Sequence, residues 1–256
     1  MGAYMSERNQ VTDKQFLGVR QAFRLLEQFQ KAVNSIVYYV RDCSVYKKEH
    51  KNKDNIYAVV WYENVTTRPT GKNRDFAVAT VKIDRDKWGW SYLPCYFVEH
   101  VLGDESIDVN YCLRFSIFQV SDDGSFVSED NEKYEGDWHF TSDFRPAEES
   151  ESWLIFSVDL YAVNKEPKLW LRKSPQNETK YPDDAQYDFV NEFIINQAEI
   201  EYAKTQFARN GEVDEVFVIK KYKMTEFSGR EGIDAVIKDF ARLMHKASHG
   251  KNIFKF

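Results

Sequence analysis

The sequence predicts an α+β fold: a mostly antiparallel sheet of about 6–7 strands, covered by a long N-terminal helix and two C-terminal helices. Three observations predict it. Residues 107–120 alternate strictly between apolar and polar side chains, as strands with one buried face do. Residues 152–163 repeat this alternation, and stretches near both ends have apolar residues at helical spacing. Because no linker rich in Pro, Gly or Ser divides the chain, we expect residues 1–256 to form one domain.

The first expected element is a helix over residues 13–42. Thr12 and Gln15 form a capping box before it, and no proline interrupts it. Its apolar residues step by three and four, as in helices that pack along a seam. This row consists of Phe16, Val19, Phe23, Leu26, Gln30, Val33, Val37 and Val40, with Gln30 its one polar member. A strand over residues 35–40 is the alternative, since that segment is β-branched and aromatic.

Strands are expected next at residues 56–63 and 75–84, with an exposed hairpin connection over residues 64–74. Residues 87–102 are aromatic but contain Gly89 and Pro94, which favours a bent or edge strand.

After the strand at 107–120, residues 121–152 form an acidic stretch long enough to be a functional loop, with at most a short strand near residues 138–141. The strand at 152–163 should lie beside the strand at 107–120, and residues 167–172 would add a short edge. A helix is expected over residues 182–209, because Pro182 opens it and Asn210-Gly211 closes it.

A last strand, 213–227, and a last helix, 230–249, complete the predicted fold. That helix would pack through apolar residues such as Ile233, Ile237 and Phe240.

Charge is unevenly distributed along the chain, whose formal net charge is −6. Residues 121–215 carry 9 Lys/Arg against 23 Asp/Glu, or −14, whereas residues 1–60 reach +4 and residues 216–256 reach +5. Acidic loops that keep a protein in solution explain this segregation, and so does a surface for a charged partner. The three cysteines form no CxxC pair, and the N-terminal segment is polar, so a cytoplasmic location is expected.

Metal ligation is weakly indicated by His245 and His249, which are four residues apart on the last predicted helix. The alternative is that these imidazoles complement the dipole at the C-terminal end of the helix. No phosphate-binding loop, dinucleotide-binding glycine motif or nucleophile motif is present, so no cofactor is expected.

Nucleic-acid binding is the second functional hypothesis, because basic residues run into aromatic ones in a pattern that can follow phosphates and stack bases. The candidate residues are Lys82, Arg85, Lys87, Trp88, Trp90, Tyr92, Lys220, Lys221 and Lys223. The alternative is that the rings lie in the core and the charges in a turn. Nucleic-acid binding would require the residues of 82–92 and the basic C-terminal residues to share one surface.

A third hypothesis is a metal-dependent phosphoester hydrolase. It needs at least three of His100, His139, His245, His249 and the acidic residues of 121–152 to converge on one site.

We expect instead an intracellular, non-catalytic binding or regulatory subunit that works through protein–protein contacts, without a membrane. Charge segregation and the long apolar helix favour this function, because both are common on docking surfaces. If the sheet covers only part of the helix, the rest of its apolar row would allow self-association. Whether the protein is an enzyme stays open at this stage, because catalytic residues far apart in sequence leave no motif.

Overall fold

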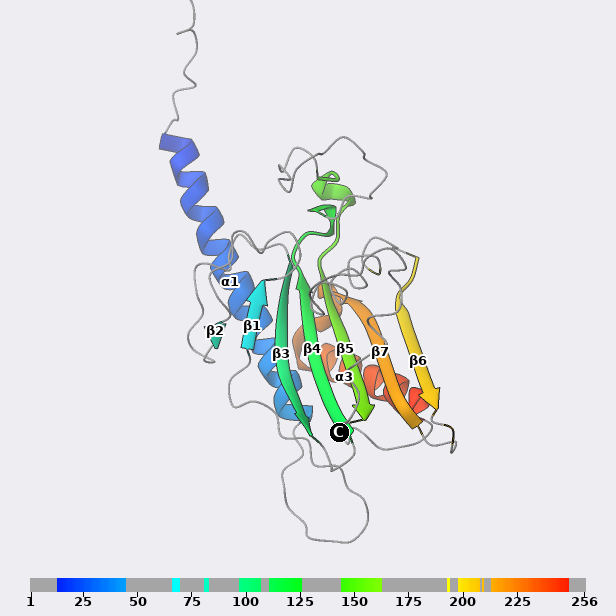
Figure 1. Ribbon diagram of the computed structural model, residues 1–256. Coiled ribbons are helices and arrows are strands. Elements are labelled where there is room, and N and C mark those ends of the chain that lie inside the picture. The colour runs from blue at the N-terminus through cyan, green and yellow to red at the C-terminus, as the bar shows by residue number, and fades with distance from the viewer. Residues whose placement is uncertain are drawn as a thin grey trace, which may run out of the picture.

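Strand β4, Tyr111–Val120, lies at the centre of the sheet (Figure 1). It pairs in antiparallel register with β3, Phe97–Ser106, on one side and with β5, Trp153–Ala162, on the other. The alternation that predicted these strands places Phe115 and Ile117 on the same face of the sheet as their β5 neighbours Val158 and Phe156. The α+β class and the antiparallel sheet are confirmed.

Among the described residues the sheet order is β2-β1-β3-β4-β5-β7-β6, and every neighbouring pair is antiparallel. Strand β7 is Val213–Lys223 and the edge strand β6 is Glu201–Phe207, whereas β1, Thr66–Pro69, and β2, Val81–Lys82, are short. The computed structural model describes residues 13–44, 66–69, 81–82, 97–106, 111–125, 144–162, 193, 198–207, 209 and 213–248.

Two long helices lie behind the sheet in Figure 1. Helix α1, Asp13–Ser44, passes behind β3, and α3, Gly229–Ala247, passes behind β5 and β7. Helix α1 continues through the β-branched segment 35–40, so the strand alternative there is wrong. Short 3-10 turns occur at Asp123–Ser125, Ala147–Glu149 and Met224–Phe227.

The main core fills the space between the sheet and the two helices. Phe156 lies at its centre, with ring centroids 5.9 Å from Phe115, 5.4 Å from Phe240 and 5.4 Å from Tyr222. Most of these rings meet edge to face, the arrangement that the ring quadrupole favours. One aromatic cluster therefore joins three central strands to α3.

The opposite face of the sheet is buried too. A second cluster there contains Phe118, Val120, Ile155, Phe217 and Ile219, together with Phe193 and Trp153. The prediction that β4 is wet on one side is wrong, because even its polar Ser116 is fully buried. The alternation is real, but it separates two buried faces.

The predicted helix over residues 182–209 is wrong in its second half. Residues 201–207 form β6, which pairs with β7 over its whole length. A helix would have turned Ala203 and Phe207 inward, whereas both are exposed on the edge strand. Pairing with the open edge of β7 outweighs the local helical spacing, because it satisfies the backbone groups of both strands. The described residues thus contain two of the three predicted helices.

Two further predictions need correction. Residues 66–69, expected in an exposed hairpin connection, form β1 between β2 and β3. The bent or edge strand predicted over residues 87–102 is in part β3, which begins at Phe97 and lies inside the sheet. The predicted strand at 56–63, most of the one at 75–84, the short strand near 138–141 and the short edge at 167–172 lie outside the described residues. No described helix is long and apolar enough to cross a membrane.

Replacing Phe156 by alanine should lower the free energy of unfolding by about 3–5 kcal/mol, because the ring is fully buried and its neighbours can close the space only in part. Urea titration followed by circular dichroism measures the change. The matched control is Phe207→Ala on β6, where the ring is 53% exposed and the expected loss is under about 1 kcal/mol. Equal losses for the two variants would contradict this description of the core.

Candidate functional site

The apolar row of α1 is buried along one half of the helix and exposed along the other. Val33, Val37 and Val40 are each 1% exposed and pack in the main core. The row continues toward the N-terminus, where Phe16 and Val19 are 50% and 52% exposed. We call the exposed part of this row, Phe16, Val19, Phe23 and Leu26, the α1 surface; Leu17 and Leu25 are exposed too, on the other side of the helix.

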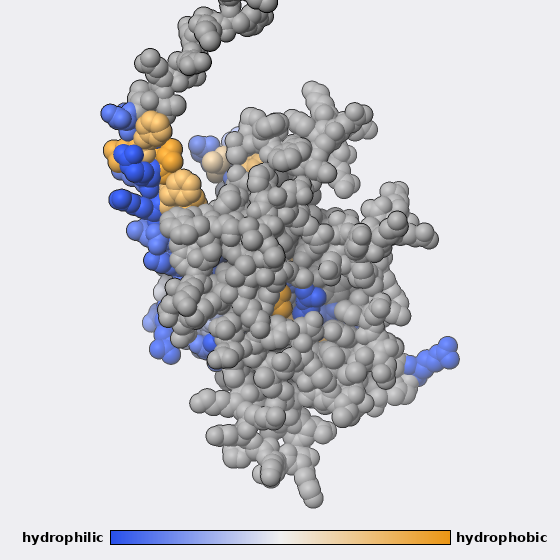
Figure 2. All heavy atoms as spheres, turned by 60° about the vertical axis from the view of Figure 1, so that its left-hand side comes forward, coloured by the Kyte–Doolittle hydropathy of each residue, from blue (hydrophilic) through white to orange (hydrophobic). Residues whose placement is uncertain are grey.

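The α1 surface exists because the helix is longer than the sheet it packs on. In Figure 1 the N-terminal half of α1 extends past the end of β3. Figure 2 shows apolar side chains gathered at this end, with hydrophilic side chains beside them. The same apolar periodicity runs through both halves of the helix. The exposed half therefore presents to the outside an apolar face like the one that the C-terminal half packs against the sheet.

A buried polar network fixes the point at which the row passes from exposed to buried. The side-chain amides of Gln30 and Gln119 exchange two hydrogen bonds, of 3.1 and 3.0 Å, between α1 and β4. Gln30 Nε2 also donates to Asn34 Oδ1, and Gln119 Nε2 to Ser121 Oγ. These paired amides satisfy groups that would be costly to bury alone, and so they specify one position of α1 on the sheet.

His100 completes this network from β3. It donates from Nε2 to the Gln119 oxygen at 3.0 Å, and its side chain is fully buried. Burial lowers the pKa of His100 from 6.5 to about 4, because the charged imidazolium loses its hydration, and the hydrogen bond to Gln119 and the nearby Glu99 charge offset only part of this effect. His100 is therefore neutral at physiological pH.

A second contact holds the C-terminal half of α1 against α3. Tyr39 donates its hydroxyl proton to Asp234 at 2.7 Å and accepts a hydrogen bond from Arg230 Nε at 3.1 Å. The hydrogen bond to Asp234 raises the pKa of Tyr39 above its ordinary value. With the glutamine pair, this contact anchors one half of the helix and leaves the other to project.

The opposite face of the sheet carries a buried polar row. Glu99 on β3 accepts hydrogen bonds from Ser116 at 2.7 Å and from Arg114 at 3.1 Å. Ser157 and Asp159 on β5 lie directly opposite Ser116 and Arg114 in register, and both are buried. Among the described residues no group of three or more His, Cys, Asp or Glu side chains could hold a metal ion. An ion pair that joins β3 to β4 accounts for the geometry of Glu99 and Arg114.

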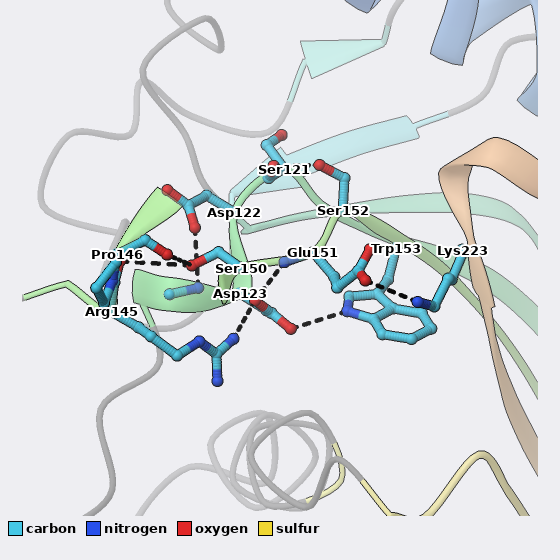
Figure 3. A network of polar contacts seen from close by, with 11 residues as sticks. Ser121, Asp122, Asp123, Arg145, Pro146, Ser150, Glu151, Ser152, Trp153 and Lys223 are labelled. Atoms are coloured by element: carbon cyan, nitrogen blue, oxygen red, sulfur yellow. Dashed lines mark hydrogen bonds and ion pairs between the residues drawn. The ribbon is translucent and has the colours of Figure 1, made fainter. Parts of the chain in front are cut away.

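A separate polar cage closes the base of the acidic stretch (Figure 3). The buried carboxylate of Asp123 accepts hydrogen bonds from the backbone N–H of Glu151 at 2.8 Å and from Trp153 Nε1 at 2.9 Å, and it forms an ion pair with Arg145. The backbone adds bonds from Arg145 N to Gly124 O and from Asp123 N to Glu151 O. This cage links the segments on either side of residues 126–143.

The three lysines of the basic C-terminal strand form contacts with other residues of this chain. Lys220 pairs with Glu201 at 2.7 Å and with Asp239 at 2.9 Å, and Lys223 pairs with Glu151 at 2.7 Å.

Lys221 is 2% exposed and donates to the carbonyl of Phe193 at 3.1 Å. Burial lowers its pKa. It also lies over the rings of Phe193 and Trp153. Alternation along β7 thus turns Lys220 to one face and Lys221 and Lys223 to the other, where Lys221 is buried, so the three do not form a single basic patch.

Several of the remaining candidate residues for nucleic-acid and metal binding are not described by the structure. The side chains of Lys82, Arg85, Lys87, Trp88, Trp90 and Tyr92 lie outside the described residues, as do His139 and His249. His245 is exposed on α3, whereas His100 is buried on β3 and bonded to Gln119. The nucleic-acid, metal and hydrolase hypotheses therefore stay predictions.

The sequence predicted the apolar row of α1 but not the polar network at which the row changes from exposed to buried. The one signal was Gln30, a polar residue at an apolar position of the row. Its partners Gln119 and His100 are remote in sequence, and nothing local marks them.

The sequence profile of one known family matches residues 9–249, which is nearly the whole chain. The chain belongs to the PM0109 family. No curated protein and no solved structure matches the chain. The match covers α1, the sheet and all of α3, so the α1 surface lies within the part that defines the family.

Stability should fall as the pH drops from 6.5 toward 4. The unfolded chain takes up a proton on His100 before the folded chain does, so at pH 5 this residue alone removes about 2 kcal/mol. His100→Gln keeps a donor to Gln119 and cannot titrate, so its loss of unfolding free energy between pH 7 and pH 5 should be smaller by that amount. His245→Gln, at an exposed position, is the control. Urea titrations at both pH values compare the three proteins, and equal pH dependence in all of them would refute the assignment.

Asp123→Asn should lower the free energy of unfolding by about 2–3 kcal/mol, because an amide cannot accept from Arg145, Glu151 and Trp153 at once, and its NH₂ opposes a donor. Near-ultraviolet circular dichroism should report the loosened Trp153. Glu148→Gln, exposed on the adjoining 3-10 turn, removes a carboxylate without touching the cage and should change little. A loss for Asp123→Asn no greater than this control's would count against the cage.

Proposed function

We propose that the protein is a non-catalytic binding or regulatory subunit that contacts another protein through the α1 surface. The observation that carries this proposal is the continuity of the apolar row. The face that α1 packs on its own sheet from Gln30 onward is presented to the outside from Phe16 to Leu26.

Helix energetics support the proposal. An amphipathic helix is held in water mainly by packing of its apolar face, and short isolated helices are marginally stable. The N-terminal half of α1 has large apolar residues in place of the polar ones that a permanently solvated helix would carry. A protein partner that covers Phe16, Val19 and Leu26 would supply the missing packing.

The anchored half of α1 supports the proposal in a second way. The glutamine pair and the Tyr39–Asp234 contact hold residues 30–44 in one orientation. The projecting half therefore starts from a fixed base, which lowers the entropy lost when a partner binds. Recognition of an amphipathic helix by an apolar groove is a common mode of protein binding.

The rival functions gain no comparable support from the described residues. Lys220, Lys221 and Lys223 are used in internal contacts. The buried carboxylate Glu99 is bonded to Arg114 and Ser116. A binding role remains the function that the described geometry favours.

Photocross-linking tests the proposal. A benzophenone amino acid placed at Val19 should give discrete covalent protein adducts in living cells, because this position lies in the middle of the α1 surface. The matched control is the same amino acid at Gln21, which is exposed and lies on the opposite side of the helix. Denaturing gels and mass spectrometry identify the adducts. Absence of adducts at Val19, or equal adducts at both positions, would overturn the proposal.

A further inference from the structure

We infer that the α1 surface binds a second copy of this chain, with the two α1 helices lying antiparallel. The inference rests on the proposed use of α1 as a binding surface and names its occupant.

The spacing of the row is the first argument. Phe16, Val19, Phe23 and Leu26 are separated by three, four and three residues, a pattern that reads the same in both directions. Two antiparallel copies centred near residue 21 would place Phe16 against Leu26 and Val19 against Phe23. Each contact would then occur twice, as in the isologous interfaces of twofold dimers.

The position of the sheet excludes the parallel arrangement. Beyond residue 26 the same face of α1 is covered by its own sheet, through the contacts of Gln30 with β4 and of Val33 in the core. A parallel neighbour that continued along this face would run into that sheet. An antiparallel neighbour diverges from it, because the helix of the second copy continues past the N-terminal end of the first.

The size of the surface sets the strength of the dimer. At half exposure each phenylalanine offers about 100 Å², and the four row residues together offer about 350 Å² per protomer. The two rows together would bury about 700 Å², below the roughly 1,200 Å² at which specific interfaces begin, because the exposed Leu17 and Leu25 lie on the far side of the helix, beside Gln21. The dimer should accordingly be weak, with a dissociation constant on the order of 100 μM.

Charge gives the inference a distinctive signature. In the antiparallel pair Arg20 of one copy faces Arg20 of the other, and Asp13 faces Glu27, so like charges flank the apolar seam. The chains also share a formal net charge of −6. Because salt screens such repulsion, dimerisation should strengthen as ionic strength rises. Binding driven by opposite charges would weaken instead.

Sedimentation velocity of the full chain tests the occupant. Between about 1 and 200 μM the wild type should shift from monomer to dimer, and 0.5 M NaCl should lower the dissociation constant about two- to fivefold. Val19→Asp should raise that constant at least tenfold, because it buries a carboxylate in the seam. Gln21→Asp, a carboxylate on the far side of the same helix, should behave like the wild type. Far-ultraviolet circular dichroism verifies that both variants fold.

Cross-linking tests the orientation. A thiol introduced by Ala22→Cys lies beside the centre of the seam and should join two copies through a short bismaleimide, whereas Gln21→Cys should not. The wild type measures any cross-linking through its native cysteines. Efficient joining at position 21 but not 22 would overturn the antiparallel pairing.

The outcomes separate the two proposals. A wild type that stays monomeric at 200 μM in 0.5 M NaCl, while Val19 still cross-links to a protein of different mass in cells, refutes the second copy and keeps the binding surface. A monomeric wild type without any adduct at Val19 refutes both. Concentration-dependent dimers that Val19→Asp abolishes and Gln21→Asp preserves support both.

Discussion

The two hydrogen bonds between the amides of Gln30 and Gln119 set the architecture, because they decide how much of α1 the sheet covers. An apolar row alone would let the helix slide along the sheet by a turn with little change in packing. Buried amides allow no such freedom, since a shift would leave each of them without a partner in a site closed to water. His100 adds a third group that fits only this arrangement. The length of helix that projects is thus fixed by polar chemistry inside the core.

Local apolar periodicity can be read from the sequence, whereas polar contacts between remote residues cannot, and this difference explains what could be predicted. The strands at residues 111–120 and 153–162, the helix that begins near residue 13, and the last helix have strong periodicity and were correctly predicted. The apolar row of α1 was predicted, but the sequence left open how much of it the sheet covers, so its exposed half is a finding of the structure. The segment at 201–207 was misjudged, because its helical spacing is local while the pairing with β7 is not. Burial of both faces of β4 was missed for the same reason: a polar residue such as Ser116 looks wet until Glu99 is known to lie beside it.

The lysines of β7 illustrate the limits of reading charge from sequence. Lys220, Lys221 and Lys223 are adjacent in the chain, and a sequence count treats them as one basic group. In the sheet, Lys221 points into the second core cluster, while Lys220 and Lys223 pair with carboxylates from different elements. The charges of Lys220 and Lys223 are neutralised by carboxylates 19 and 72 positions away, which no local pattern reveals.

The cage around Asp123 has a consequence for how this fold can vary. Because Arg145 N bonds to Gly124 O, the chain leaves the sheet and returns to it through neighbouring backbone atoms. The two ends of the intervening segment are therefore held together regardless of its sequence. The entropy cost of closing such a segment rises only slowly with its length. Insertions, deletions or a grafted peptide between these two residues would leave the strands aligned, which makes this junction the natural place for the fold to accept foreign sequence.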